Sequence, residues 1–185
     1  MHIKMKQKIS LIAILCFLTL ITLAQTDPNN VPKPPTERLK IFSPYFGKYK
    51  QTMTYAGIKW NGTMEVKPII KGWYVDWTIL TKSEDNKIDR EYHMLVTWDS
   101  SLNKYRIWRF ETLPHNNNEI TLSTEGTDII LEMKLPPLEP NGKPEIFYNR
   151  YSKPTNDEIK IVSEMHSLDG KVTEHIGITT ATKIK

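Results

Sequence analysis

Two histidines and a glutamate in the C-terminal part of the sequence are suited to acid–base or metal chemistry. Glu164 and His166 are two positions apart on a strand-like run, so their side chains share one face, and His175 lies on the run that returns from the next turn. Imidazole can ligate zinc or haem iron and titrates near neutral pH, so such a site is one interpretation. Exposed histidines on strands are far commoner, so we expect no metal and no cofactor.

Arginines could bind the anionic end of a ligand. Arg106 and Arg109 fall on opposite faces of one strand-like run, and Arg150 lies on another. A guanidinium that points into an apolar interior needs a partner. Arg109 or Arg150 could therefore bind a ligand carboxylate, whereas the commoner arrangement is a structural ion pair or a stack on a tryptophan. The candidate ion-pair partners are Asp76, Glu111 and Glu164.

Aromatic residues could form the apolar wall of a binding cavity. Four of the five tryptophans lie between Gly72 and Thr112, on three consecutive strand-like runs. Aromatic side chains bury the largest area per residue, so this segment should hold the densest part of the core. If part of it lines a cavity, we expect the wall to contain Trp77, Tyr92, Trp98, Trp108 and Tyr148.

Common catalytic motifs are absent from the sequence. It contains no glycine-rich phosphate loop, no Gly-x-Ser-x-Gly and no His-Glu-x-x-His. Catalytic groups on a barrel can come from distant strands, so an enzyme that acts on a small organic substrate through inward His166 and Glu164 is an alternative.

The elements that would position these residues are β-strands, because from Gly47 onward apolar and polar residues alternate. Alternation of this kind indicates antiparallel strands with one dry and one wet face. Turn sequences such as Asp99-Ser100-Ser101 and Asp169-Gly170 separate about ten such runs. Two examples of a shared face are Trp73, Val75, Trp77 and Ile79, and Tyr92, Met94, Val96 and Trp98.

Several runs carry aromatic residues on both faces, which favours a barrel over a two-layer sandwich. A barrel can line an internal cavity with one face and pack further elements on the other. Before the first strand, Thr36 is placed to cap a short helix with Leu39 and Phe42 on its apolar side, and Pro44 is expected to end it. The sequence therefore predicts an all-β fold, an antiparallel barrel of about ten strands with a short N-terminal helix across one end.

The first residues have the pattern of a secretory signal peptide. Three lysines precede the uncharged apolar run Ile9–Leu23, and Thr22-Leu23-Ala24 provides a cleavage site. We expect residues 1–24 to be the signal, residues 25–35 a proline-rich linker and residues 36–185 the barrel domain. The protein would then be exported, to the periplasm or the extracellular space, and the single cysteine, Cys16, would be removed with the signal.

The net charge of +4 gives no reason to expect a nucleic-acid partner. Residues 1–24 contain three of the 25 basic residues and none of the 21 acidic ones, so removing them leaves 22 basic and 21 acidic residues, a net charge of +1. We expect neither nucleic-acid binding nor membrane attachment after the signal is removed.

Four short segments resemble a known family. They are Phe46-Gly47-Lys48-Tyr49, Ile70-Lys71-Gly72-Trp73-Tyr74-Val75, Val96-Thr97-Trp98-Asp99 with Lys104-Tyr105, and Ser167-Leu168-Asp169-Gly170-Lys171. Together they resemble the bacterial lipocalin-like family catalogued as domain of unknown function 1579, over residues 36–184. The resemblance implies a calycin-type antiparallel barrel and no established activity. Tyr49, where lipocalin-like barrels have tryptophan, and the Pro136–Pro144 loop depart from the pattern.

The function that these features favour is reversible binding of a small apolar or amphipathic molecule inside the barrel. Arg109 or Arg150 would meet its polar end. The alternatives are the enzyme described above and a fully packed barrel that serves as an interaction module of the cell envelope.

Overall fold

A computed structural model describes residues 32–55, 57–85, 87–112, 119–137 and 142–185. Residues 34–185 form a compact unit of their own. The predicted signal peptide, most of the predicted linker and Cys16 lie outside the described residues. In the described part of the chain, no helix has the length and apolar character needed to span a bilayer.

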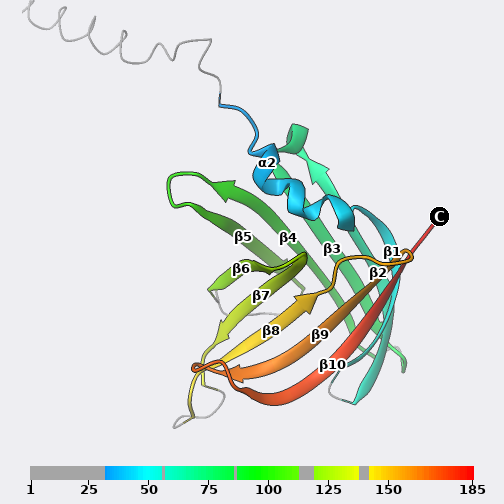
Figure 1. Cartoon of the computed structure of the whole chain (residues 1–185). Helices are drawn as coiled ribbons and strands as arrows, with labels where there is room; N and C mark the ends of the chain where they lie inside the picture. The colour runs from blue at the N-terminus through cyan, green and yellow to red at the C-terminus, as the bar shows by residue number, and fades with distance from the viewer. Residues whose placement is uncertain (1–31, 56, 86, 113–118, 138–141) are drawn as a thin grey trace, which may run out of the picture. The chain divides into compact units, whose positions relative to one another are not determined.

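The predicted all-β fold is confirmed, because the unit is a nearly closed barrel of ten antiparallel strands (Figure 1). Sequence neighbours other than β5 and β6 pair as hairpins, and β1 also pairs with β10, so the sheet curls until its edge strands β5 and β6 come into contact. The strands are β1 (Gly47–Tyr55), β2 (Ile58–Ile69), β3 (Tyr74–Ser83), β4 (Asp89–Asp99), β5 (Lys104–Glu111), β6 (Ile120–Glu125), β7 (Asp128–Leu135), β8 (Glu145–Tyr151), β9 (Glu158–Ser167) and β10 (Val172–Lys183).

Burial along the strands follows the alternation of the sequence. In β3, Val75, Trp77 and Ile79 are buried, whereas the residues between them are only partly covered. The buried set points into the barrel and the other set points outward, as the pleat of a strand requires. β5 shows the same two-residue period, whereas burial in β7 and β8 does not alternate.

A short helical segment lies across one end of the barrel, as predicted (Figure 1). It consists of α2 (Thr36–Leu39) and the 3-10 helix η1 (Lys40–Tyr45), and it buries Leu39 and Phe42. Two details of the prediction are wrong. Pro35 occupies the N-cap position and Thr36 is the first helical residue, and Pro44 lies inside η1, which continues to Tyr45.

Aromatic residues fill the barrel beneath this segment. The Trp77 ring lies 6.4 Å from that of Phe42 and 4.6 Å from that of Tyr151, both edge to face. The Tyr45 hydroxyl donates to the carbonyl oxygens of Tyr151 at 3.0 Å and Thr127 at 3.2 Å. We call this region the closed end. It consists of the helical segment with Phe42, Tyr45, Tyr49, Trp77 and Tyr151.

Candidate functional site

The rest of the barrel interior contains a cavity of about 550 Å³. This volume falls within the range of small-molecule binding sites. Because the strands run up and down, β5 and β7 end, and β4 and β8 begin, at the end of the barrel opposite the helical segment. Cavity-lining residues there, including Glu91, Pro136 and Glu174, are exposed, so the cavity opens to solvent at that end. The apolar wall includes Ile79, Met94, Leu131, Met133, Phe147 and Ile161.

Arg109 points into the cavity but its charge is already paired. Its Nε forms an ion pair with the Glu111 carboxylate, and Nη1 donates to the Met133 sulfur at 3.1 Å. The guanidinium carbon also lies 5.0 Å from the centre of the Tyr92 ring. Of the two roles considered from the sequence for Arg109, the ion pair is the one that the structure contains.

Two polar residues with a glycine between them lie in one row across three neighbouring strands of the cavity wall. Gln51 of β1 pairs with Gly62 of β2, and Gly62 pairs with Thr81 of β3. Gln51 and Thr81 are only 2% and 5% exposed, and both line the cavity. Among the described residues, neither Gln51 Nε2 nor Thr81 Oγ1 has a hydrogen-bond partner.

Gly62 is required between them because the two backbones approach closely. A Cβ atom at this position would overlap the carbonyl oxygen of Leu80. The sequence prediction did not include Gln51 or Thr81. By alternation, Gln51 shares a strand face with the apolar residues Tyr49 and Met53, and Thr81 shares one with Trp77 and Ile79. A polar residue on an otherwise apolar strand face is the pattern that could have identified them.

Two of the predicted wall residues lie at or near the closed end. Trp77 faces inward but is fully buried in the aromatic cluster, and the cavity-lining set does not include it. The Trp98 ring packs 4.9 Å from that of Tyr105, with the guanidinium of Arg38 4.6 Å above it. Tyr92 and Arg109 are the predicted residues that line the cavity.

The remaining predicted residues lie on the outer face, which corrects the expected cavity wall. In β5 the inward set contains Ile107 and Arg109, so Trp108 points outward and is 39% exposed. In β8 the inward set contains Phe147 and Asn149, so Tyr148 and Arg150 point outward. The physical reason is that both faces of these strands carry aromatic or charged residues, so the phase that faces inward is fixed by barrel closure. Whether any of these residues binds a ligand stays a prediction.

Glu164 and His166 are also on the outer face, where they form a cluster with His175. Glu164 contacts His166 at 2.9 Å and His175 at 2.8 Å, and the Tyr148 ring stacks on that of His166 with 4.4 Å between centroids. In the described ranges, no group of three or more potential ligands is placed to hold a metal ion. The enzyme alternative required inward His166 and Glu164, and the structure does not place them there.

Arg150 is part of a second outer cluster. Its Nε contacts Asp128 at 2.8 Å and its Nη1 contacts Glu125 at 3.1 Å. These carboxylates hold the pKa of Arg150 above its ordinary value, mainly through the hydrogen bond to Asp128. The Arg150 charge is therefore paired on the outer face, away from the residues that line the cavity.

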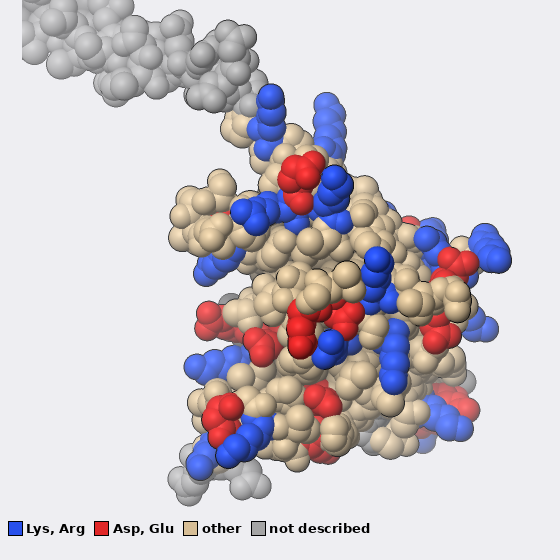
Figure 2. All heavy atoms as spheres, in the orientation of Figure 1, with Lys and Arg blue, Asp and Glu red and all other residues tan. Residues whose placement is uncertain are grey.

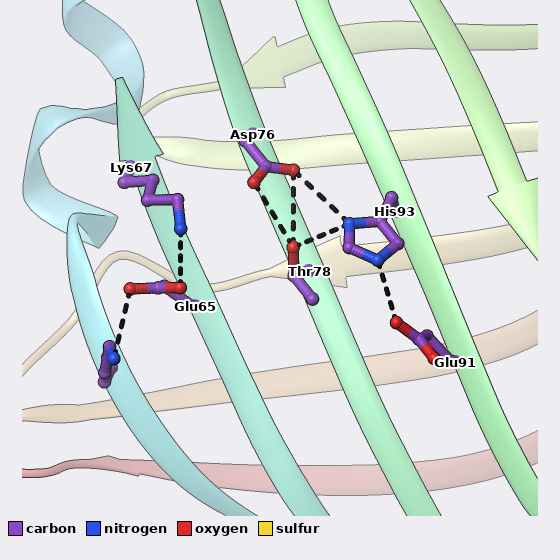
Figure 3. A network of polar contacts seen from close by, with 7 residues as sticks. Glu65, Lys67, Asp76, Thr78, Glu91 and His93 are labelled. Carbon is purple, nitrogen blue, oxygen red and sulfur yellow. Dashed lines mark hydrogen bonds and ion pairs between the residues drawn. The ribbon is translucent and has the colours of Figure 1, made fainter. Parts of the chain in front are cut away.

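Figure 3 shows a further polar network on the outer face of β3 and β4. Thr78 Oγ1 lies 2.9 Å from His93 Nδ1 and 3.3 Å from an Asp76 oxygen, and His93 Nε2 lies 3.0 Å from Glu91. The order hydroxyl, imidazole, carboxylate is that of a catalytic relay, but Thr78 and His93 do not line the cavity.

Figure 2 shows basic and acidic side chains interspersed over the visible face.

Comparison with known proteins adds little to this description. Neither the protein-family models nor the curated proteins gave a match. Among solved structures, the chain is similar to a de novo designed fluorescence-activating β-barrel, with a TM-score of 0.39 and 10% sequence identity over 77% of this chain and 95% of that one.

Proposed function

We propose that this protein binds a small apolar or amphipathic molecule inside the barrel. The observation that carries the proposal is the cavity of about 550 Å³, whose wall is largely apolar and which opens to solvent at one end. Burial of apolar ligand surface there contributes roughly 25 cal/mol per Å². A fully packed interaction module would have no use for such a space.

We also propose that the protein is exported and belongs to the lipocalin-like family. The signal-peptide pattern of residues 1–24 supports export. The short segments described above, together with an antiparallel barrel that has a helical segment across one end, support the family assignment.

The binding proposal is tested by titrating the purified protein with Nile red, an uncharged dye whose fluorescence rises in apolar surroundings. We expect saturable binding. Leu131→Trp would fill part of the cavity and weaken the dye affinity by at least about tenfold, since a tenfold change corresponds to about 1.4 kcal/mol.

Leu80→Trp is the matched control, because it makes the same substitution on the outer face, where Leu80 is 44% exposed. It should leave dye binding unchanged, and circular dichroism would show that both variants fold. The absence of saturable binding to the unaltered protein, or equal weakening by both substitutions, would refute the proposal.

A further inference from the structure

The cavity wall contains two polar atoms, Gln51 Nε2 and Thr81 Oγ1, that have no hydrogen-bond partner within the described part of the chain. Gln51 and Thr81 are more than nine-tenths buried, line the cavity and stand on either side of Gly62. A buried polar group without a hydrogen bond destabilises the folded protein, typically by about 1–3 kcal/mol. Two such groups in one row across the cavity wall, on β1 and β3, therefore indicate where a ligand supplies the missing bonds.

The chemistry of the two groups defines the ligand atom that fits them. The Gln51 amide nitrogen can only donate, and the Thr81 hydroxyl can donate or accept. A ligand oxygen with two lone pairs can accept a hydrogen bond from either group. Carbonyl oxygens of amides and esters meet this requirement, and so do carboxylate oxygens.

The charge of the cavity separates these possibilities. Among the described residues, its lining contains two arginines and four glutamates. The Arg109 charge is paired with Glu111. A ligand carboxylate would add a further negative charge to a lining in which glutamates outnumber arginines even without Glu91, whose carboxylate contacts His93 on the outer face. Repulsion between like charges is stronger in a partly desolvated site than in water. The lining therefore disfavours a carboxylate.

We propose that the cavity selects uncharged amphiphiles whose polar end is a carbonyl group, an amide or an ester, and that Gln51 and Thr81 bind its oxygen. This inference rests on the proposed function, because it names the class of molecule that the cavity takes. The apolar chain of the ligand lies against the wall formed by residues such as Met94, Leu131 and Phe147.

Unpartnered polar atoms outside the cavity do not have the same meaning. The indole nitrogens of Trp60 and Trp77 also lack partners among the described residues, but neither side chain lines the cavity. The Trp77 ring is enclosed by aromatic neighbours, and the Arg90 guanidinium carbon lies 4.8 Å from the centre of the Trp60 ring. No ligand reaches either nitrogen, whereas Gln51 and Thr81 face a space that opens to solvent.

The test compares three probes with the same alkyl chain and different ends: decanamide, decanoate and decylammonium. Each displaces Nile red from the purified protein at neutral pH. We expect decanamide to bind at least about tenfold more tightly than decanoate. Its carbonyl oxygen can accept the same hydrogen bonds, and it brings no negative charge into the cavity. Decylammonium, which cannot accept a hydrogen bond, should bind more weakly than decanamide.

Substitutions assign the selectivity to the two residues. Gln51→Leu and Thr81→Val should each weaken decanamide binding several-fold and reduce its preference over decanoate. Ser163→Ala is the matched control, because Ser163 also lines the cavity but its hydroxyl already donates to Asn149 at 2.7 Å. It should not alter the preference for the amide.

The outcomes separate this inference from the proposed function. If Nile red binds and Leu131→Trp blocks it, but decanamide and decanoate bind equally, the cavity binds ligands and the carbonyl inference is wrong. Tighter binding of decylammonium than of decanamide would also overturn it, since the glutamates would then select the ligand. If the dye does not bind at all, the proposed function itself fails.

Discussion

The two halves of the barrel interior treat polar groups differently. At the closed end, the Tyr45 hydroxyl donates to two carbonyl oxygens and the Tyr49 hydroxyl donates to the Tyr45 carbonyl at 2.9 Å. In the cavity, Gln51 Nε2 and Thr81 Oγ1 have no partner among the described residues. The tyrosine hydroxyls of the closed end thus have partners within the protein, although the Trp77 indole nitrogen has none among the described residues, whereas in the cavity two polar atoms remain for the proposed ligand.

At the closed end, burial raises the pKa values of tyrosine hydroxyls. It raises the pKa of Tyr45 to about 12, with a smaller contribution from Asp128. It also raises the pKa of Tyr151 well above the ordinary value. Both phenols therefore stay neutral over the whole physiological range and can serve as permanent donors.

The largest expected effect is that of Trp77→Ala at the closed end. The substitution would leave a large void in the aromatic cluster and lower the free energy of unfolding by about 3–5 kcal/mol. Urea denaturation measures this. Trp108→Ala is the control on the outer face, with an expected loss below about 1.5 kcal/mol. Equal losses would show that the closed end is not the main source of stability.

Gly62→Ala tests the close approach of β2 and β3 beside the cavity. The added methyl group would overlap the Leu80 carbonyl oxygen, so the strands would have to separate. We expect a loss of about 1–3 kcal/mol in the free energy of unfolding, together with weaker ligand binding. Asn61→Ala, at an exposed position on the same strand, should have little effect on either quantity. An unchanged Gly62→Ala variant would contradict the tight strand spacing.

Tyr45→Phe tests the completed hydrogen bonds of the closed end. It removes the donor to Thr127 and Tyr151 and should lower the free energy of unfolding at neutral pH by about 1–1.5 kcal/mol. The pKa of Tyr45 is raised from its ordinary value of 10.0 to about 12 in the folded protein, so between these pH values the unfolded chain loses a proton that the folded protein keeps. Stability from Tyr45 is complete below pH 10 and decreases as the pH rises toward 12.

The measurement for Tyr45→Phe is urea denaturation at a series of pH values. The free energy of unfolding of the variant should decrease less steeply across the alkaline range than that of the unaltered protein. Parallel curves would mean that Tyr45 titrates equally in the folded and unfolded states.

The smallest expected effect has the opposite sign. Gln51→Leu replaces an unpartnered buried amide with an apolar group of similar size, so the ligand-free protein should gain up to about 1 kcal/mol in the free energy of unfolding. Ser163→Ala, which removes a completed hydrogen bond in the same cavity, should lower it. A destabilised Gln51→Leu variant would show that the Gln51 amide is satisfied in the free protein, which removes the contrast between the two halves.

Much of the fold follows from the sequence, because alternation of apolar and polar residues is a direct requirement of strands in a barrel. The cavity follows less well. In β5 and β8, residues such as Trp108 and Tyr148 make the outer face look as apolar as the inner one, and only the pairing of β1 with β10 fixes which face turns inward. Gln51 and Thr81 were visible as polar residues in apolar phases, but their lack of partners depends on contacts between strands that one sequence does not contain.

The contact between β5 and β6 has a consequence for exchange of backbone amide hydrogens with solvent. These strands are the two edges of the sheet, so between their described residues no ladder bonds protect the facing amides. The Arg109 side chain extends from β5 to Met133 of β7 and spans this line of contact. We expect deuterium to enter the edge amides of β5 and β6 first and those of β1 and β10 last.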